Sequence, residues 1–165
     1  SIPVFSWLMN QTTMGLDLDN QPHVVTYHLE EPERPQGKLA HNPPPEIAAK
    51  LRLFHYWRTT DERWHGSGPV TPLSTRPGIV FDRCGNLIVY YADSGHLRIH
   101  TAQGHGAWSH WEHSSVEVPG VSLVKVSKPD LGRMQRDGVL SMVGTTVERD
   151  GRRGFAMLDF ELEDR

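Results

Sequence analysis

Residues 75–111 constrain the fold more than any other part of the chain, because they predict four short strands in succession. The apolar positions here are β-branched or aromatic, which favours a pleated, half-buried surface. They are Val80, Ile88, Val89, Tyr90, Tyr91 and Ile99. Two tripeptides between the predicted strands, Cys84-Gly85-Asn86 and Asp93-Ser94-Gly95, are typical of tight turns, where glycine adopts positive φ. The stretch therefore predicts an antiparallel β-meander.

The same pattern occurs two more times in the chain. The first copy aligns with the stretch above, with Pro22 as one extra residue: 17–27 against 82–91, 51–54 against 97–100, and Trp64 against Trp108 or Trp111. A degenerate third copy comprises 123–126, 138–143 and 155–160. Repeated four-stranded units predict an all-β fold made of β-propeller blades. A single β-sandwich or an open meander with chance similarity is the alternative.

The repeats divide residues 1–165 into a single partial propeller domain. Its predicted blades are 10–70, 74–118 and 121–163. The proline-rich residues 30–45 are expected to form an inserted loop, since proline is excluded from helix interiors and central strands, and 46–50 one helical turn. A propeller closes with about four to eight blades. We therefore expect the chain to be part of a longer protein, with self-assembly as the alternative.

Composition and charge exclude several classes of function. The formal net charge of −3 gives no electrostatic case for nucleic-acid binding. No apolar run is long enough to span a bilayer, so no membrane partner is predicted, and this segment has no signal peptide. Cys84 is the only cysteine, which excludes an intrachain disulfide and a multi-cysteine zinc site. The sequence predicts no metal and no cofactor.

Four short motifs suggest a family. They are Asn10-Gln11-Thr12-Thr13-Met14 followed by Asp17 and Pro22-His23-Val24-Val25; Pro72-Leu73-Ser74-Thr75-Arg76-Pro77; Asp137-Gly138-Val139-Leu140-Ser141; and Leu158-Asp159-Phe160-Glu161-Leu162. These motifs resemble segments of the BNR-repeat polysaccharide lyases, notably the ulvan lyases. The resemblance covers most of this chain but only about the last third of the family's domain.

The resemblance implies a seven-bladed propeller that cleaves an acidic, sulfated, uronate-containing polysaccharide by β-elimination. It also implies a secreted or periplasmic protein. The expected partners are the acidic polysaccharide and the upstream blades of the same protein. The family's catalytic histidine, tyrosine and arginine belong to those upstream blades, so no catalytic residue is assigned here. The segment alone is expected to be inactive.

Candidate substrate-binding residues follow from the predicted start of each inner strand, where propeller ligands usually meet the protein. They are Asn10, Gln11, Arg76 and Lys125, with Lys128 nearby. Two amides, a guanidinium and two ammonium groups around one axis would suit carboxylate and sulfate groups.

The alternative is structural. The amides of Asn10 and Gln11 can bond turn backbone, and Arg76 can pair with an aspartate such as Asp82.

Histidines and tryptophans give weaker signals. His55 and Tyr56 could act as an acid–base pair, but adjacent strand residues point to opposite faces of a sheet. The same objection applies to Tyr27 and His28. His110 and His113 form a weak metal pattern and are better explained as a solvated outer-strand face. The recurring tryptophans, Trp57, Trp64, Trp108 and Trp111, are expected to pack in the core.

Two other functions remain open. One is a sialidase-like glycoside hydrolase propeller, although residues 61–64 and 104–108 lack the full sialidase box. The other is a propeller that binds carbohydrate without catalysis.

Overall fold

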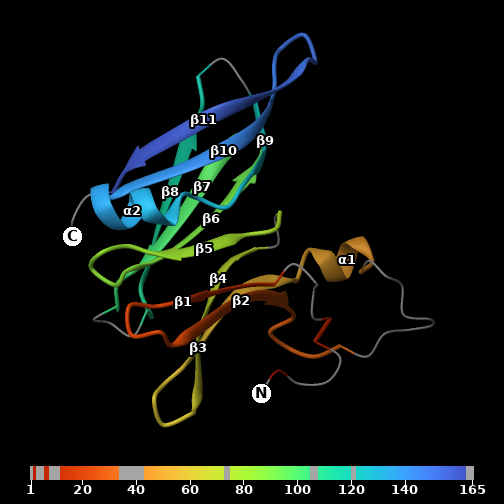
Figure 1. Cartoon of the computed structure of the whole chain (residues 1–165). Coiled ribbons are helices and arrows are strands. Elements are labelled where there is room, and N and C mark those ends of the chain that lie inside the picture. The colour runs from red at the N-terminus through yellow and green to blue at the C-terminus, as the bar shows by residue number, and fades with distance from the viewer. Residues whose placement is uncertain are drawn as a thin grey trace.

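The computed structural model describes residues 2, 6–7, 12–33, 43–72, 75–104, 108–119 and 122–162, which form three antiparallel sheets (Figure 1). The first sheet, in the order β1-β2-β3-β4, contains β1 (Thr13–Leu16), β2 (Pro22–His28), β3 (Arg52–Arg58) and β4 (Trp64–Pro72). The second, β5-β6-β7-β8, contains β5 (Gly78–Phe81), β6 (Leu87–Asp93), β7 (His96–Ala102) and β8 (Trp111–Glu117). The third, β11-β10-β9, contains β9 (Ser122–Val126), β10 (Val139–Val147) and β11 (Arg153–Glu161). The predicted succession of antiparallel strands is confirmed.

Two short helices interrupt the strands. Helix α1 (Pro45–Ala48) forms the predicted helical turn but begins one residue earlier than the predicted 46–50, with a proline at its first position. Helix α2 (Leu131–Asp137) lies in a polar stretch for which no helix was expected. It forms because the Asp130 side chain accepts a hydrogen bond from Arg133 N, while Gly138 ends the helix at φ 70°. Neither helix in the described ranges is long or apolar enough to cross a membrane.

The third sheet corrects the prediction of three four-stranded units, because only three strands belong to it within the described residues. Its strands β10 and β11 are longer than their counterparts and pair along nine positions, from Val139–Glu161 to Val147–Arg153. The extended pairing between these two strands replaces part of the repeat pattern.

The first hairpins of the first two sheets match residue for residue. Asp17 N donates to Gln21 O in one turn, and Asp82 N donates to Asn86 O in the other. Pairing resumes directly after each turn, as Leu16 with Pro22 and as Phe81 with Leu87. Pro22 therefore corresponds to Leu87, and the prediction that it is an extra residue is wrong. Proline is tolerated there because it is the first residue of its strand.

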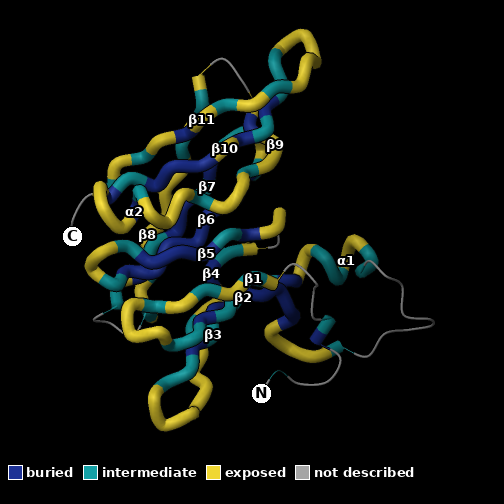
Figure 2. The backbone as a smooth tube through the Cα atoms, in the orientation of Figure 1, coloured by how far each residue is buried: buried dark blue, intermediate teal, exposed yellow. Residues whose placement is uncertain are grey.

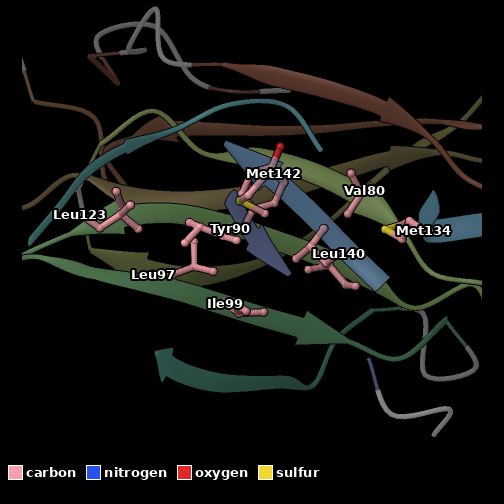
Figure 3. Packing of buried hydrophobic residues seen from close by; sticks show 11 residues of the cluster. Val80, Tyr90, Leu97, Ile99, Leu123, Met134, Leu140 and Met142 are labelled. Carbon is pink, nitrogen blue, oxygen red and sulfur yellow. The ribbon is translucent and has the colours of Figure 1, made fainter. Parts of the chain in front are cut away.

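The second sheet lies between the other two (Figures 1 and 2). It contributes side chains to both cores. Successive residues of a strand point to opposite faces, so its apolar residues divide into two sets. The core with the first sheet contains Val25, Tyr27, Leu53, Val70, Ile79, Phe81, Leu87 and Val89. The core with the third sheet, drawn in Figure 3, contains Val80, Ile88, Tyr90, Ala92, Leu97, Ile99, Leu123, Met134, Leu140, Met142 and Leu158. This double burial explains why residues 87–92 are apolar throughout instead of alternating.

Candidate functional site

The first strands of the three sheets, β1, β5 and β9, border a cavity of about 640 Å³. Apolar side chains form much of its wall, including Met14, Ile79 and Val124. Three cationic side chains also line it: Arg76, Lys125 and Lys128. We call this cavity the inner-strand groove. An apolar wall with a few convergent charged groups is typical of a ligand site.

Arg76 is exposed and lines the groove just before β5. Two hydrogen bonds fix the segment before Arg76, one to the second sheet and one from the first. Thr75 Oγ1 donates to Ala92 O at 2.6 Å, and Tyr27 Oη donates to Thr75 O at 3.4 Å. Pro77, which follows, is buried and restricts Arg76 to extended backbone geometry. The guanidinium is therefore presented from an anchored segment.

The carboxylate of Asp82 accepts hydrogen bonds from residues of the turn that Asp82 begins. Its Oδ1 accepts hydrogen bonds from Cys84 N and Asn86 N, and its Oδ2 accepts one from Asn86 Nδ2 at 2.8 Å. The alternative role of Arg76, as a partner of Asp82, gains no support from these contacts.

Lys125 is exposed on β9, and Lys128 is exposed just beyond its end. The structure thus brings Lys125 and Arg76 to one groove from two different sheets. Asn10 and Gln11 lie outside the described residues.

A histidine and a tyrosine that the sequence did not associate form a pair in the first sheet. His55 and Tyr56 do face opposite sides: His55 contacts His23, whereas Tyr56 contacts His28. His28 Nδ1 donates to Leu29 O at 2.6 Å, so in the neutral imidazole Nε2 accepts from Tyr56 Oη at 2.7 Å. Burial raises the pKa of Tyr56. This pair could exchange a proton, and its residues are absent from the lining of the groove.

A chain of four polar side chains crosses the first sheet on its other face. Asp17 Oδ2 lies 3.2 Å from His23 Nε2, His23 Nδ1 lies 2.8 Å from His55 Nε2, and His55 Nδ1 lies 3.1 Å from Ser67 Oγ. Both imidazoles are fully buried. Burial lowers the pKa of His23. Burial and the neighbouring His23 lower the pKa of His55 to about 3. Both rings are therefore neutral at pH 7.

A second chain lies on the facing side of the second sheet. His100 Nε2 is 2.9 Å from Tyr91 Oη, which is 3.1 Å from Thr71 Oγ1, and His100 Nδ1 contacts His113 Nδ1. Burial lowers the pKa of His100 to about 4, and His113 adds to this shift. His113 is exposed, as expected for an outer strand, but it also pairs with this buried ring. Across the described part of the chain, no three His, Cys, Asp or Glu side chains are grouped to hold a metal ion.

The tryptophans divide into two groups. Trp108 meets the His23 ring edge-on at 4.5 Å and the Trp57 ring at 5.5 Å, and Trp111 meets the His55 ring at 5.8 Å. These three pack around the buried histidines, as predicted. The prediction fails for Trp64, which is 54% exposed, because it starts the outermost strand of the first sheet.

One sequence feature indicates that His23 and His55 are buried: each alternates with apolar residues on one face of its strand. His23, Val25 and Tyr27 share one face of β2, and Leu53, His55 and Trp57 share one face of β3. Only the strand register, which pairs Val25 with His55, brings the two imidazoles together.

We compared the chain with known protein families and with curated proteins. No family model matches it, and no curated protein does.

Proposed function

We propose that the three sheets are blades of a β-propeller whose inner-strand groove binds an acidic, sulfated, uronate-containing polysaccharide. The observation that carries the proposal is the convergence of Arg76, Lys125 and Lys128 on one groove from two sheets. A guanidinium can bind a carboxylate or sulfate through two parallel hydrogen bonds, and the ammonium groups add charge without fixing orientation. The apolar wall suits the nonpolar faces of sugar rings.

The proposal includes β-elimination, as an ulvan-like polysaccharide lyase, by a protein that contains this segment and further blades. That reaction requires a cation to neutralise the uronate carboxylate, a base to take the C5 proton and an acid to protonate the leaving oxygen. Arg76 suits the first role. The proposal takes the base and the acid from the further blades, because the His28–Tyr56 pair, which has the chemistry of both, does not line the groove. Because the polymer is extracellular, the proposal places the protein outside the cytoplasm.

Binding without catalysis is the second candidate, and one observation favours it. His28 and Tyr56 contact each other on the face of the first sheet that points away from the second, and neither lines the groove. A groove that this histidine–tyrosine pair does not reach would bind the polymer and leave it intact.

Two measurements test the proposal. Calorimetric titration of this chain with a sulfated polyuronate should show binding that weakens as salt rises, and a neutral glucan should not bind. Incubation of a longer, ring-completing chain with the same polymer should produce the ultraviolet absorbance of an unsaturated uronate. New reducing ends without that absorbance would instead indicate a hydrolase. Binding with neither product would indicate a carbohydrate-binding protein without catalysis. Failure to bind would refute the proposal.

A further inference from the structure

The four-residue chain from Asp17 to Ser67 has a defined direction of proton donation. A carboxylate can only accept, so His23 Nε2 carries a proton and donates it to Asp17 Oδ2. His23 is neutral, so its Nδ1 accepts, and His55 Nε2 must be the donor across the 2.8 Å contact. His55 is neutral too, which leaves its Nδ1 to accept from Ser67 Oγ at 3.1 Å. Every proton therefore points towards Asp17.

Ser67 sits where a reagent can reach it. It is half-buried on β4, one of the two edge strands of the first sheet, and lies between Gly66 and Gly68. Its hydroxyl proton is engaged by His55, so the oxygen lone pairs remain for attack. The His55 ring is covered by Trp111, whose buried Nε1 lacks a hydrogen-bond partner among the described residues.

We propose that Ser67 is a nucleophile activated by the relay His55–His23–Asp17, and that the site hydrolyses small carboxylic esters such as acetyl esters. This activity goes beyond the proposed polysaccharide function and does not depend on it. The arrangement resembles a serine–histidine–aspartate triad in its roles, with one additional imidazole between the base and the carboxylate.

The reaction balances with water as the co-reactant. Ser67 Oγ bonds to the ester carbonyl carbon, its proton moves to His55 Nδ1, and the His55 Nε2 proton moves to His23 Nδ1. The bond from carbonyl carbon to alkoxy oxygen then breaks, and the protons return along the relay so that the alcohol leaves. Water then attacks the acyl carbonyl carbon and gives a proton to His55 Nδ1. The bond from that carbon to Ser67 Oγ breaks, Ser67 Oγ takes the proton back, and the carboxylic acid leaves. In each half-reaction the positive charge rests on His23, where the Asp17 carboxylate 3.2 Å away stabilises it.

A fluorophosphonate probe, which bonds covalently to activated serines, tests the nucleophile. We expect peptide mass spectrometry of the labelled chain to find the phosphonyl group on Ser67, and Ser67→Ala to abolish both labelling and hydrolysis of 4-nitrophenyl acetate. Ser109 is the matched control, because its Oγ also lies 3.1 Å from a histidine Nδ1, that of His110, but both residues are exposed. An unlabelled Ser67 in the folded chain, or equal labelling of Ser109, would overturn the proposal.

Asp17→Asn tests the relay separately from the serine. Asparagine can still accept the two turn hydrogen bonds from Asp19 N and Gln21 N, so the fold should survive. Its amide nitrogen, however, would donate to His23 Nε2 and reverse every donor along the chain, so that His55 could no longer take the Ser67 proton. We expect labelling to slow at least a hundredfold, while near-ultraviolet circular dichroism of the tryptophans stays unchanged. Labelling at the original rate would disprove the relay.

Discussion

His23 Nδ1 and His55 Nε2 lie 2.8 Å apart inside the closed interface between the first and second sheets. Burial disfavours the charged form of each imidazole, and of the two rings only His23 faces a carboxylate, that of Asp17, within the described residues. The interface holds this pair beside apolar residues and places His100 in a similar setting on the opposing sheet. Its stability should therefore depend on pH.

We predict that the protein loses stability in acid. The folded-state pKa is about 3 for His55 and about 4 for His100, whereas the unfolded chain titrates near the ordinary value of 6.5. The unfolded state therefore binds more protons below that value, and stability falls as pH decreases from about 6.5 towards 4. Each such histidine contributes a slope of about 1.4 kcal/mol per pH unit in this window. Urea unfolding at a series of pH values measures the slope.

His100→Gln separates the effect of one histidine from general acid sensitivity. Between pH 6 and pH 4, the unfolding free energy of the variant should fall less steeply with pH than that of the wild type, by the contribution of about one proton, whatever its stability at pH 7. His110→Gln changes an exposed histidine and is the control. A wild-type slope in His100→Gln would show that His100 titrates alike in the folded and the unfolded chain.

Arg76→Lys should weaken the binding of a sulfated polyuronate about ten- to a hundredfold. A lysine keeps the charge but cannot form the two parallel hydrogen bonds, which are worth on the order of 1.5–3 kcal/mol. Calorimetric titration gives the affinity, and thermal unfolding should change little because the side chain is exposed. Arg152→Lys, in the β10–β11 turn, is the control for a guanidinium on another surface. A lower melting temperature with unchanged affinity would identify Arg76 as a structural residue.

Gly78→Thr should destabilise the fold by about 1–3 kcal/mol through overpacking. A Cβ at Gly78 would lie 2.0 Å from Tyr90 Cζ, on the partner strand. In the first sheet the equivalent pair is Thr13 and Val25, where a larger residue faces a smaller one. Tyr90→Val combined with Gly78→Thr should therefore recover part of the loss in denaturant unfolding. If the double variant is no more stable than the prediction from adding the two single changes, the pair is not in steric conflict.

Asp82→Ala should cost about 1–2 kcal/mol, because three hydrogen bonds of one turn depend on this carboxylate. The same change at Asp150, whose Oδ1 accepts one backbone N–H in the exposed β10–β11 turn, should cost less. Chemical denaturation of both variants gives the comparison. Equal losses would mean that the Asp82 turn adds nothing beyond an ordinary surface turn.

The sequence by itself determined the repeated strand pattern. Residues 78–102 alternate β-branched and aromatic residues with turn tripeptides, and the copy at 13–28 reproduces the turn built on Asp17 and Asp82. These are local signals, since strand preference and turn chemistry depend on neighbours along the chain. The same locality limits them: helix α2 was missed because its cap is a single Asp130 hydrogen bond within a polar stretch.

Only the tertiary structure decided which side chains meet. Arg76 and Lys125 reach one groove because two sheets lie against each other. His23, His55 and Ser67 form a chain because strand register aligns β2, β3 and β4. A shift of one residue in register would turn each side chain to the opposite face, so proximity across strands cannot be read from spacing along one strand. Burial, which keeps the histidines neutral, likewise comes from packing between sheets and from no single segment.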